Sequence, residues 1–391
     1  MKIKINKESF IKSWSLTERS AGTPSSMNIF SSVRMKADEN GVEMQSTDIK
    51  TSVICKASGV DVIEPGEAVI PTKGVSDLFK KAGSSEFTIQ VDEGKALMIS
   101  GRSRYRFTTY ATSEFPKLPS SSGGSFFCSI NASVLSSSID RGTLCSSPND
   151  QEFPHYLSAV YFEIDSGCLN IVSTDKRRLA LSRTEMNESG EGRPLLLPFK
   201  GIKELQKILG MIEHDTEVRI IYDDAQAYFT APGVEFAVRK VESNFPAYAR
   251  ILPTSSTTTT IVDRLELTSA IERVDVVVRD YNKVAILDVS KDGDCVISGR
   301  APEFGEAVET IACSTVGEPI KAGFNTKFFM DAVKVLDGPS ASLSFNGPGS
   351  HMLVRASDSD SFLCMVAPLE LSREEIDTED VAENAHRGDV L

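Results

Sequence analysis

The amino-acid sequence predicts an α+β protein made of three tandem copies of one domain. Ser-Thr-Asp stands at residues 46–48 and again at 173–175, a shift of 127 residues. Ile-Pro-Thr-Lys-Gly at 70–74, Leu-Pro-Phe-Lys-Gly at 197–201 and Phe-Asn-Thr-Lys at 324–327 keep the same shift between their lysines. Repeats of about 20–50 residues indicate a solenoid, whereas this period is the length of a whole domain. Three such copies fill most of the 391 residues.

Two polar runs mark the boundaries between the copies. Ser120–Gly124 is rich in serine and glycine, and Thr254–Thr260 is rich in serine and threonine, so both are expected to be extended linkers. The expected domains are 1–124, 125–254 and 255–371. The segment that remains, 372–391, carries seven acidic and two basic residues and is expected to be a disordered acidic tail.

Apolar periodicity predicts two helices and several antiparallel strands in each copy, which is the α+β class. The apolar residues of Val75–Ala82 fall at the i, i+3, i+4, i+7 spacing of one helix face. Alternating apolar residues from Glu86 to Ser100, around Asp92-Glu93-Gly94, predict a β-hairpin. Helices are expected at about 7–20, 72–82, 132–138, 199–209, 265–274 and 326–336. Further strands are expected at about 41–57, 102–110, 159–164, 169–173, 218–222, 227–230, 284–289 and 294–298, with a hairpin turn at 346–349.

Composition excludes several classes of protein. No apolar run is long enough to span a bilayer, and the N-terminus lacks the apolar core of a signal peptide, so we expect a cytoplasmic protein. The seven cysteines are scattered and odd in number, which predicts reduced and mostly buried thiols. Four histidines without ligand spacing predict no structural metal, and no cofactor is expected. The net charge of −13 argues against a surface that binds nucleic acid everywhere, but it allows a local basic face.

An enzyme is one alternative. Asp48 and Asp175 lie in equivalent Ser-Thr-Asp stretches, and a pair of carboxylates can bind a metal. They belong to different domains, however, and have no histidine or cysteine nearby in the sequence. The chain also lacks a Walker loop, a nucleophile elbow and a His-Glu-x-x-His motif, so we expect no catalytic activity.

A set of short motifs, in order on this triplicated frame, resembles one known family. The motifs are Ser100-Gly101-Arg102-Ser103-Arg104, Thr174-Asp175 with Arg178-Leu179-Ala180, Asn244-Phe245-Pro246 with Tyr248, Gly323-Phe324-Asn325, and Met365-Val366-Ala367-Pro368-Leu369. Over residues 1–371 the chain resembles the beta subunit of bacterial DNA polymerase III, the sliding clamp. Each motif is weak alone, and their combination is specific.

The resemblance implies a head-to-tail homodimer in which six clamp domains close a ring, with the sheets outside and twelve helices around the hole. Helices about 10–12 Å across would give a circle of about 120 Å circumference, wide enough for duplex DNA. The implied function is that of a processivity factor in chromosomal replication, a non-catalytic subunit of the DNA polymerase III holoenzyme. It would hold DNA without reading its sequence, close to the nucleoid. An ATP-driven clamp loader would open the ring.

Basic residues on the second helix of each copy would face the DNA, because lysines bind phosphates without base specificity. The predicted DNA-facing residues are Lys73, Lys80, Lys81, Lys200, Lys203, Lys207, Lys327 and Lys334. The first helices are not basic, so the lining is expected to be uneven. An arginine of the family falls on Thr23 in this sequence, which puts that DNA contact in doubt.

Complementary edges would close the ring. Arg102, Arg104 and Arg106 alternate along one predicted strand, and therefore share one face. The family places its acidic partners in the third copy. The predicted dimer interface is Arg102, Arg104, Arg106, Phe107, Val276, Val277, Glu303, Glu306 and Glu309. The alternative is an ordinary charged edge strand that prevents aggregation.

In the family, linear peptides of partner proteins bind a pocket between the second and third copies. The partners implied are the DNA polymerase III alpha subunit, the clamp loader, repair polymerases, mismatch-repair proteins and ligase. The corresponding residues are Leu157, Thr174, Arg178, Leu179, Pro246, Arg250, Ile251, Asn325, Phe328, Met365, Val366, Pro368 and Leu369. This chain departs from the family at Lys176-Arg177, Ala367 and Asn282, so its peptide preference is expected to differ.

A non-encircling scaffold that binds peptides remains the second alternative. It would keep the pocket, remain monomeric and bind circular and linear DNA alike. The basic helices and the charged edges argue against it.

Overall fold

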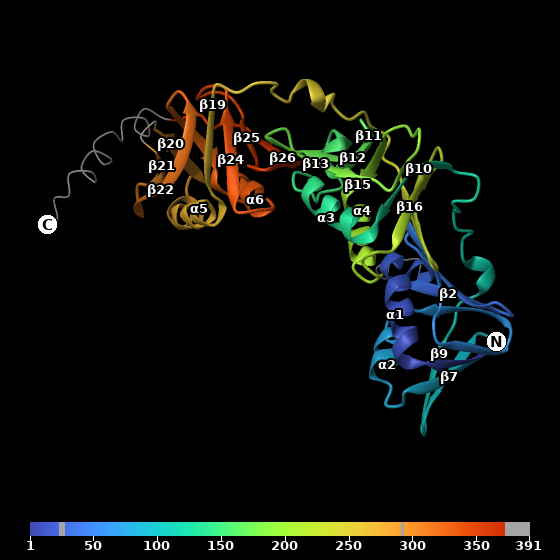
Figure 1. Ribbon diagram of the computed structural model, residues 1–391. Helices are drawn as coiled ribbons and strands as arrows, with labels where there is room; N and C mark the ends of the chain where they lie inside the picture. Colours follow the sequence, from blue (N-terminus) through green and yellow to red (C-terminus); the bar gives the residue numbers. More distant parts are fainter. Residues whose placement is uncertain (23–27, 291–292, 372–391) are drawn as a thin grey trace. The chain divides into compact units, whose positions relative to one another are not determined.

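The computed structural model describes residues 1–22, 28–290 and 293–371 (Figure 1). The expectations for Thr23 and for the acidic segment 372–391 lie outside these residues. The chain forms two compact units, which are described separately below. The first comprises Met1–Asp140, Pro148–Leu169 and Thr184–Ser243, and the second comprises Arg141–Ser147, Asn170–Arg183 and the chain from Asn244.

The order of the elements repeats three times: a strand, a helix, a set of strands, a second helix and three strands. The two helices of each copy and strands between them were predicted, whereas the strand that opens each copy was not. The first copy contains β1 (Lys2–Asn6), α1 (Lys7–Thr17), β2 (Ser32–Asp38), β3 (Gly41–Thr47), β4 (Thr51–Lys56), β5 (Val60–Glu64), β6 (Gly66–Pro71), α2 (Val75–Lys81), β7 (Glu86–Asp92), β8 (Lys95–Ser100) and β9 (Ser103–Thr108).

The second copy contains β10 (Ser125–Asn131), α3 (Ala132–Gly142), β11 (Ala159–Asp165), β12 (Cys168–Thr174), β13 (Arg178–Glu185), β14 (Glu188–Ser189), β15 (Leu195–Pro198), α4 (Phe199–Leu209), β16 (Glu217–Tyr222), β17 (Gln226–Ala231) and β18 (Val234–Arg239). The third contains β19 (Thr258–Asp263), α5 (Arg264–Val278), β20 (Val284–Val289), β21 (Asp294–Ala301), β22 (Gly305–Gly317), β23 (Ile320–Asn325), α6 (Thr326–Lys334), β24 (Ser340–Phe345), β25 (Met352–Ala356) and β26 (Ser359–Val366).

The copies are joined through their strands. In the first unit the sheets run β5-β1-β7-β8-β9 and β14-β10-β16-β17-β18-β4-β3-β2-β6. Strand β4 of the first copy therefore pairs with β18, the last strand of the second copy. In the second unit the order includes β13-β26-β25-β24-β19-β22-β21-β20-β23. Here β13 of the second copy pairs with β26, the last strand of the third, which repeats the same junction.

The helices begin where a side chain or a special backbone geometry can stop the preceding strand. Asn6, Asp263 and Asn325 each accept a hydrogen bond from a backbone N–H of the first turn, at α1, α5 and α6 respectively. Such caps satisfy N–H groups that have no partner within the helix. Helix α2 begins three residues later than predicted, because Gly74 before it takes a φ of 80° that interrupts the helical backbone.

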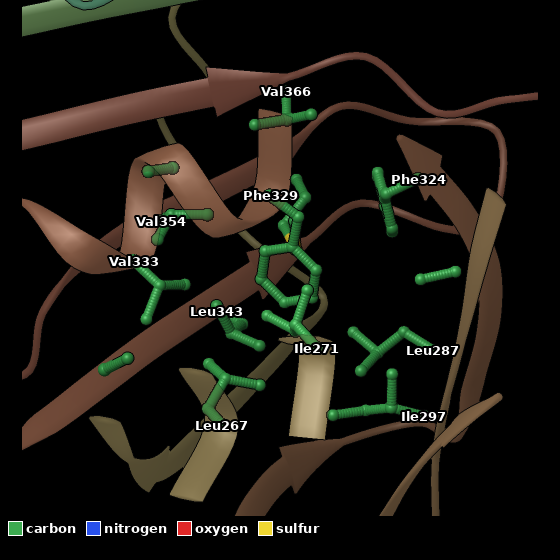
Figure 2. Close-up of a cluster of buried hydrophobic side chains, with 14 of the residues drawn as sticks. Leu267, Ile271, Leu287, Ile297, Phe324, Phe329, Val333, Leu343, Val354 and Val366 are labelled. Atoms are coloured by element: carbon green, nitrogen blue, oxygen red, sulfur yellow. The ribbon is translucent and has the colours of Figure 1, made fainter. Parts of the chain in front are cut away.

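Each unit buries the apolar faces of its helices against strands. In the first copy Phe79 of α2 packs between Phe10 and Trp14 of α1, with ring centroids 5.4 and 4.8 Å away. In the second unit Leu267 and Ile271 of α5 and Phe329 and Val333 of α6 fill one core with strand residues (Figure 2). Each fully buried side chain of this size stabilises the fold by about 1.5–3 kcal/mol.

Most predicted elements are confirmed within a few residues. The helix predicted at 199–209 has the same bounds in the structure, whereas those at 132–138 and 265–274 extend to Gly142 and Val278. The thirteen-residue strand β22 was not predicted. Five of the seven thiols are buried, as expected, and burial raises the pKa of Cys128 to about 12. No helix in the described parts of the chain is long and apolar enough to cross a membrane.

Candidate functional site

The two Ser-Thr-Asp stretches form the same tight turn. Asp48 accepts hydrogen bonds from the backbone N–H groups two and three residues further on, at 3.0 and 2.6 Å. Asp175 does so at 3.0 and 2.9 Å. The hydroxyls of Thr47 and Thr174 donate to the carbonyl four residues on, at 2.7 and 2.8 Å. The motif is therefore a structural turn, and the described residues contain no cluster of three possible metal ligands.

The second copy adds Arg178 to this turn, at the start of β13. Its guanidinium group donates to Asp175 through Nε and to Asp331 of α6 through Nη1, both at 2.9 Å. It also lies 4.2 Å from the ring centroid of Phe328. Arg178 therefore connects α6 to the beginning of β13. Its first role is to fix this surface, whereas sequence reasoning expected it to orient a bound peptide.

The predicted pocket residues differ in their accessibility. Leu179 and Met365 lie opposite each other in the β13–β26 ladder and are buried, as are Thr174 and Val366. Ile251 has 48% of its surface exposed, and Arg250 beside it is exposed as well. Pro246, Asn325, Phe328, Pro368 and Leu369 are half-buried. The second unit therefore supplies a rim of accessible residues above a buried apolar floor.

Leu157 is buried and belongs to the first unit, whereas the other twelve predicted pocket residues belong to the second. Within the second unit a cavity of about 540 Å³ opens beside residues 368–371. Its lining is Lys321, Ala322, Gly323, Pro348, Gly349, Pro368, Leu369, Glu370 and Leu371. Two predicted pocket residues, Pro368 and Leu369, thus line a cavity of the size that binds small ligands or peptide side chains.

Gly323 lies against the segment that follows β26. The backbone N–H of Leu369 donates to the Gly323 carbonyl at 2.8 Å. A Cβ on Gly323 would lie 2.4 Å from Leu371 Cδ2, closer than real contacts allow. The glycine of the Gly323-Phe324-Asn325 motif therefore leaves room for the Leu371 side chain where Leu369 pairs with β23.

Most of the predicted DNA-facing lysines already have acidic partners. Their Nζ atoms lie 2.6–3.6 Å from carboxylate oxygens in six cases, namely Lys80, Lys200, Lys203, Lys207, Lys327 and Lys334. Lys73 and Lys81 are exposed and have no side-chain partner within the described residues. The second helices therefore present fewer unpaired positive charges than their sequences indicate.

Two strand edges carry the residues that were predicted to close a dimer. Strand β9 ends its sheet, and Arg104 and Arg106 are exposed on it, while Arg102 precedes it in the turn. Strand β22 pairs with β21 over residues 305–312 and with β19 over 313–317. Its first half therefore has one free edge, next to exposed Glu303 and Glu306. Phe107 and Val277 are partly buried against the cores of their own domains, whereas Val276 has 48% of its surface exposed.

Glu309 lies away from this acidic group. Glu309 lies three residues after Glu306 in β22, so its side chain points to the opposite face of the sheet. On that face Arg273 of α5 donates two hydrogen bonds to the Glu309 carboxylate, at 2.7 and 2.6 Å. The hydrogen-bonded guanidinium group holds the pKa of the Glu309 carboxyl below its usual value. Glu306 and Glu309 thus lie on opposite faces of β22, and the role of Glu309 at a dimer edge stays a prediction.

Sequence reasoning missed two residues at these sites. Asp331 binds both Arg178 and Lys327, but its partners lie on different elements and give no sequence signal except the i, i+4 spacing to Lys327. Phe304 has 68% of its surface exposed at the start of the free β22 edge. An aromatic residue between Glu303 and Glu306 in a short turn is the signal that could have indicated it.

Three α+β copies joined by the same strand pairing, with β9 and the first half of β22 left without the equivalent partner in the described residues, define a protein of the sliding-clamp class. Family models of the DNA polymerase III beta subunit match its N-terminal domain to residues 1–119, its central domain to 129–247 and its C-terminal domain to 249–370. The chain belongs to this family.

Individual relatives agree along the whole chain. The beta sliding clamp of Pseudomonas aeruginosa is 27% identical over 373 residues, which cover 95% of this chain and 100% of that protein. The crystal structure of the P. aeruginosa DNA polymerase III subunit beta matches with a TM-score of 0.88 at 27% identity, and the coverage is again 95% and 100%. The sliding clamp of Bacillus subtilis matches in fold with a TM-score of 0.89 at 24% identity, with the same coverage. These likenesses support the clamp over the non-encircling scaffold.

Proposed function

We propose that two copies of this chain join head to tail through β9 of one and β22 of the other, and so close a ring of six clamp domains around duplex DNA. The observation that carries the proposal is the repeated junction. Strand β4 pairs with β18 and β13 pairs with β26, in both cases the last strand of the next copy. By the same rule β22 lacks its partner and β9, the last strand of the first copy, lacks its own. A second chain supplies both.

Charge and side-chain direction favour this pairing. In antiparallel strands, directly opposite residues point to the same face. Arg104 and Arg106 occupy the exposed face of β9, and Glu306 occupies the exposed face of β22, directly opposite Arg300 in the β21–β22 ladder. A joined sheet would place the partner's arginines on the other side of Glu306. The glutamate would then stand between basic residues on both sides, a favourable arrangement for cross-strand pairs.

The ring catalyses nothing in this proposal, and its function is retention. It tethers the replicative polymerase to its template, so that dissociation no longer limits synthesis, and it works in the cytoplasm at the nucleoid. Lysines of the second helices contact phosphates without reading bases. A clamp loader opens the ring. The DNA polymerase III alpha subunit, repair polymerases, mismatch-repair proteins and ligase bind it through peptides at the rim around Ile251, Phe328, Pro368 and Leu369.

The rim of the peptide site carries a positive charge of its own. Lys176, Arg177 and Arg250 are exposed, and their side chains have no ion-pair partner among the described residues. We expect a preference for peptides with acidic residues beside the apolar anchors. The test is the anisotropy of a labelled clamp-binding peptide. Ile251→Asp should abolish binding without unfolding the protein, because this side chain is half exposed, whereas Leu179→Asp would bury a carboxylate. Unchanged affinity in Ile251→Asp rejects the site.

Two measurements test the ring. Light scattering across a dilution series should give a dimer, and R104E should shift the chain toward monomer at a given concentration. Arg239→Glu is the matched control, since Arg239 is an exposed basic residue at the end of β18, whose edge β4 already occupies. The chain loaded onto nicked circular plasmid should stay bound until the plasmid is cut. A monomer at micromolar concentration, together with equal loss from circular and linear DNA, would refute the proposal.

A further inference from the structure

Each copy contains an ion pair that joins its second helix to the first helix or to the residue that directly follows it. In each copy a lysine of the second helix lies beside a carboxylate, at Nζ–O distances of 3.2, 3.6 and 2.7 Å. The pairs are Lys80 with Glu18 at the end of α1, Lys203 with Asp140 of α3, and Lys334 with Glu272 of α5. Lys80 and Lys334 keep the 127-residue period of the repeat, whereas Lys203 stands four residues before the equivalent Lys207, so the copies form such a pair from different helix positions.

The acidic members are held in position by neighbouring groups. Glu18 accepts hydrogen bonds from Trp14 Nε1 at 3.2 Å and from the Ser76 hydroxyl of α2. Asp140 accepts one from Gln206 Nε2 at 3.2 Å. These two carboxylates are therefore built into the helix pair and are not carried there only by the mobile lysine.

We infer that Glu18, Asp140 and Glu272 regulate the charge of the DNA-facing surface, each holding one lysine as a neutral pair until a phosphate competes for it. The inference rests on the proposed encirclement of DNA. It assigns a function to acidic residues of the first helices, which the sequence alone presents only as an unexplained lack of basic charge.

Physical chemistry explains why a sliding surface would need such pairs. An exposed lysine–carboxylate pair contributes little to stability, so a phosphate can take over the lysine at small cost. Beyond a Debye length of about 8–10 Å the pair attracts DNA hardly more than a neutral side chain does. Each lysine–phosphate contact steepens the fall of log affinity with log salt concentration by about 0.9, and the cost of first breaking an ion pair lowers the affinity gained from that contact.

The test removes the acidic charges and keeps their hydrogen-bonding atoms. The variant E18Q/D140N/E272Q retains an oxygen acceptor at each position, so that Trp14 and Gln206 keep their partners. The control E64Q/D224N/D358N makes the same change of charge at exposed acidic residues on strands and turns. Binding to a short labelled duplex is measured by anisotropy across a salt series. The first variant should bind about tenfold more tightly than wild type at low salt, because its lysines need not leave an acidic partner, and the gain should shrink as the salt concentration rises.

The outcomes separate this inference from the proposed function. If wild type leaves circular and linear DNA at equal rates, encirclement fails and this inference fails with it. If wild type is retained on circles but E18Q/D140N/E272Q binds no more tightly than the control triple, the inference alone is overturned. Adding K80Q, K203Q and K334Q to the first variant should remove its gain. Should E18Q prevent folding, D140N/E272Q should still bind the duplex more tightly than the matched control D224N/D358N at low salt.

Discussion

Arg178→Met should destabilise the β13–α6 region by about 2 kcal/mol. The Arg178 side chain has only 11% of its surface exposed and makes two ion pairs of 2.9 Å, with Asp175 and Asp331. Hydrogen bonds to charged groups are worth about 1.5–3 kcal/mol each, so complete loss would cost about 3–6 kcal/mol.

The expected loss of stability is smaller, because both carboxylates keep other partners and contact water, and because methionine can contact the Phe328 ring. Asp175 keeps the two backbone N–H donors of its turn, and Asp331 keeps Lys327 Nζ at 3.2 Å, so neither carboxylate is left without a partner. Both acidic side chains are also about a quarter exposed, which lets water solvate them. A methionine sulfur beside the Phe328 ring recovers about 0.3–1.5 kcal/mol of the lost cation–π contact. The balance is the expected loss of about 2 kcal/mol.

Native-state hydrogen exchange is the appropriate assay, because a chain of several domains does not unfold in one step. A loss of about 2 kcal/mol speeds exchange of amides in the β13–β26 ladder about 30-fold where they open locally. Arg177→Met is the matched control, since Arg177 is exposed and should change exchange by less than about twofold. If both variants exchange alike, the buried network contributes nothing and the reasoning is wrong.

Two further predictions concern packing and pH. Gly201→Ala should lower the melting temperature, because the new Cβ would lie 2.6 Å from Val238 Cγ2. Overpacking of this kind costs about 1–3 kcal/mol. Gly83→Ala is the control and should not lower the melting temperature, because the space around Gly83 is open. Arg273→Gln should raise the pKa of Glu309, which the hydrogen-bonded guanidinium group depresses, and an NMR titration of its carboxyl carbon would measure the change. A depressed pKa stabilises the fold above the unfolded-state value and is lost as pH falls through the folded value. Wild type should therefore lose this contribution below about pH 4.5, and the variant should show no such loss.

The repeat, the helices and the turns could be predicted because their signals are local. The apolar spacing within Phe199–Leu209 is enough to define α4, and the period of 127 residues is visible in Ser-Thr-Asp alone. Strand β22 could not be predicted in the same way. Its first half has a free edge and alternates exposed residues with half-buried ones, so no continuous apolar signal marks it. An edge strand without a partner therefore lacks the buried apolar residues by which a strand is recognised in a sequence.

The sequence predicted that the second helices carry lysines, but it did not predict that acidic residues would pair with most of them. Counting lysines on one element gives a basic face, because the count omits residues that only the fold brings near. Lys334 meets Glu272, which is 62 residues away on another helix, and Lys200 meets Asp150 in the chain that follows α3. No periodicity within a helix contains this information. The same limit applies to Arg178, whose partner Asp331 comes from the next copy of the domain.

The spacing of three glutamates in the sequence already contained information about the face on which Glu309 lies. Glu303, Glu306 and Glu309 recur every third residue, and side chains three positions apart in a strand point to opposite faces. Once β22 is known to be a strand, Glu306 and Glu309 are assigned to opposite faces of the sheet, and α5 supplies Arg273 on the face where Glu309 lies. The arginines of β9 recur every second residue and do share a face. Spacing assigns an interface only after the secondary structure is known, so the dimer edge of this chain should depend on Glu306 and not on Glu309.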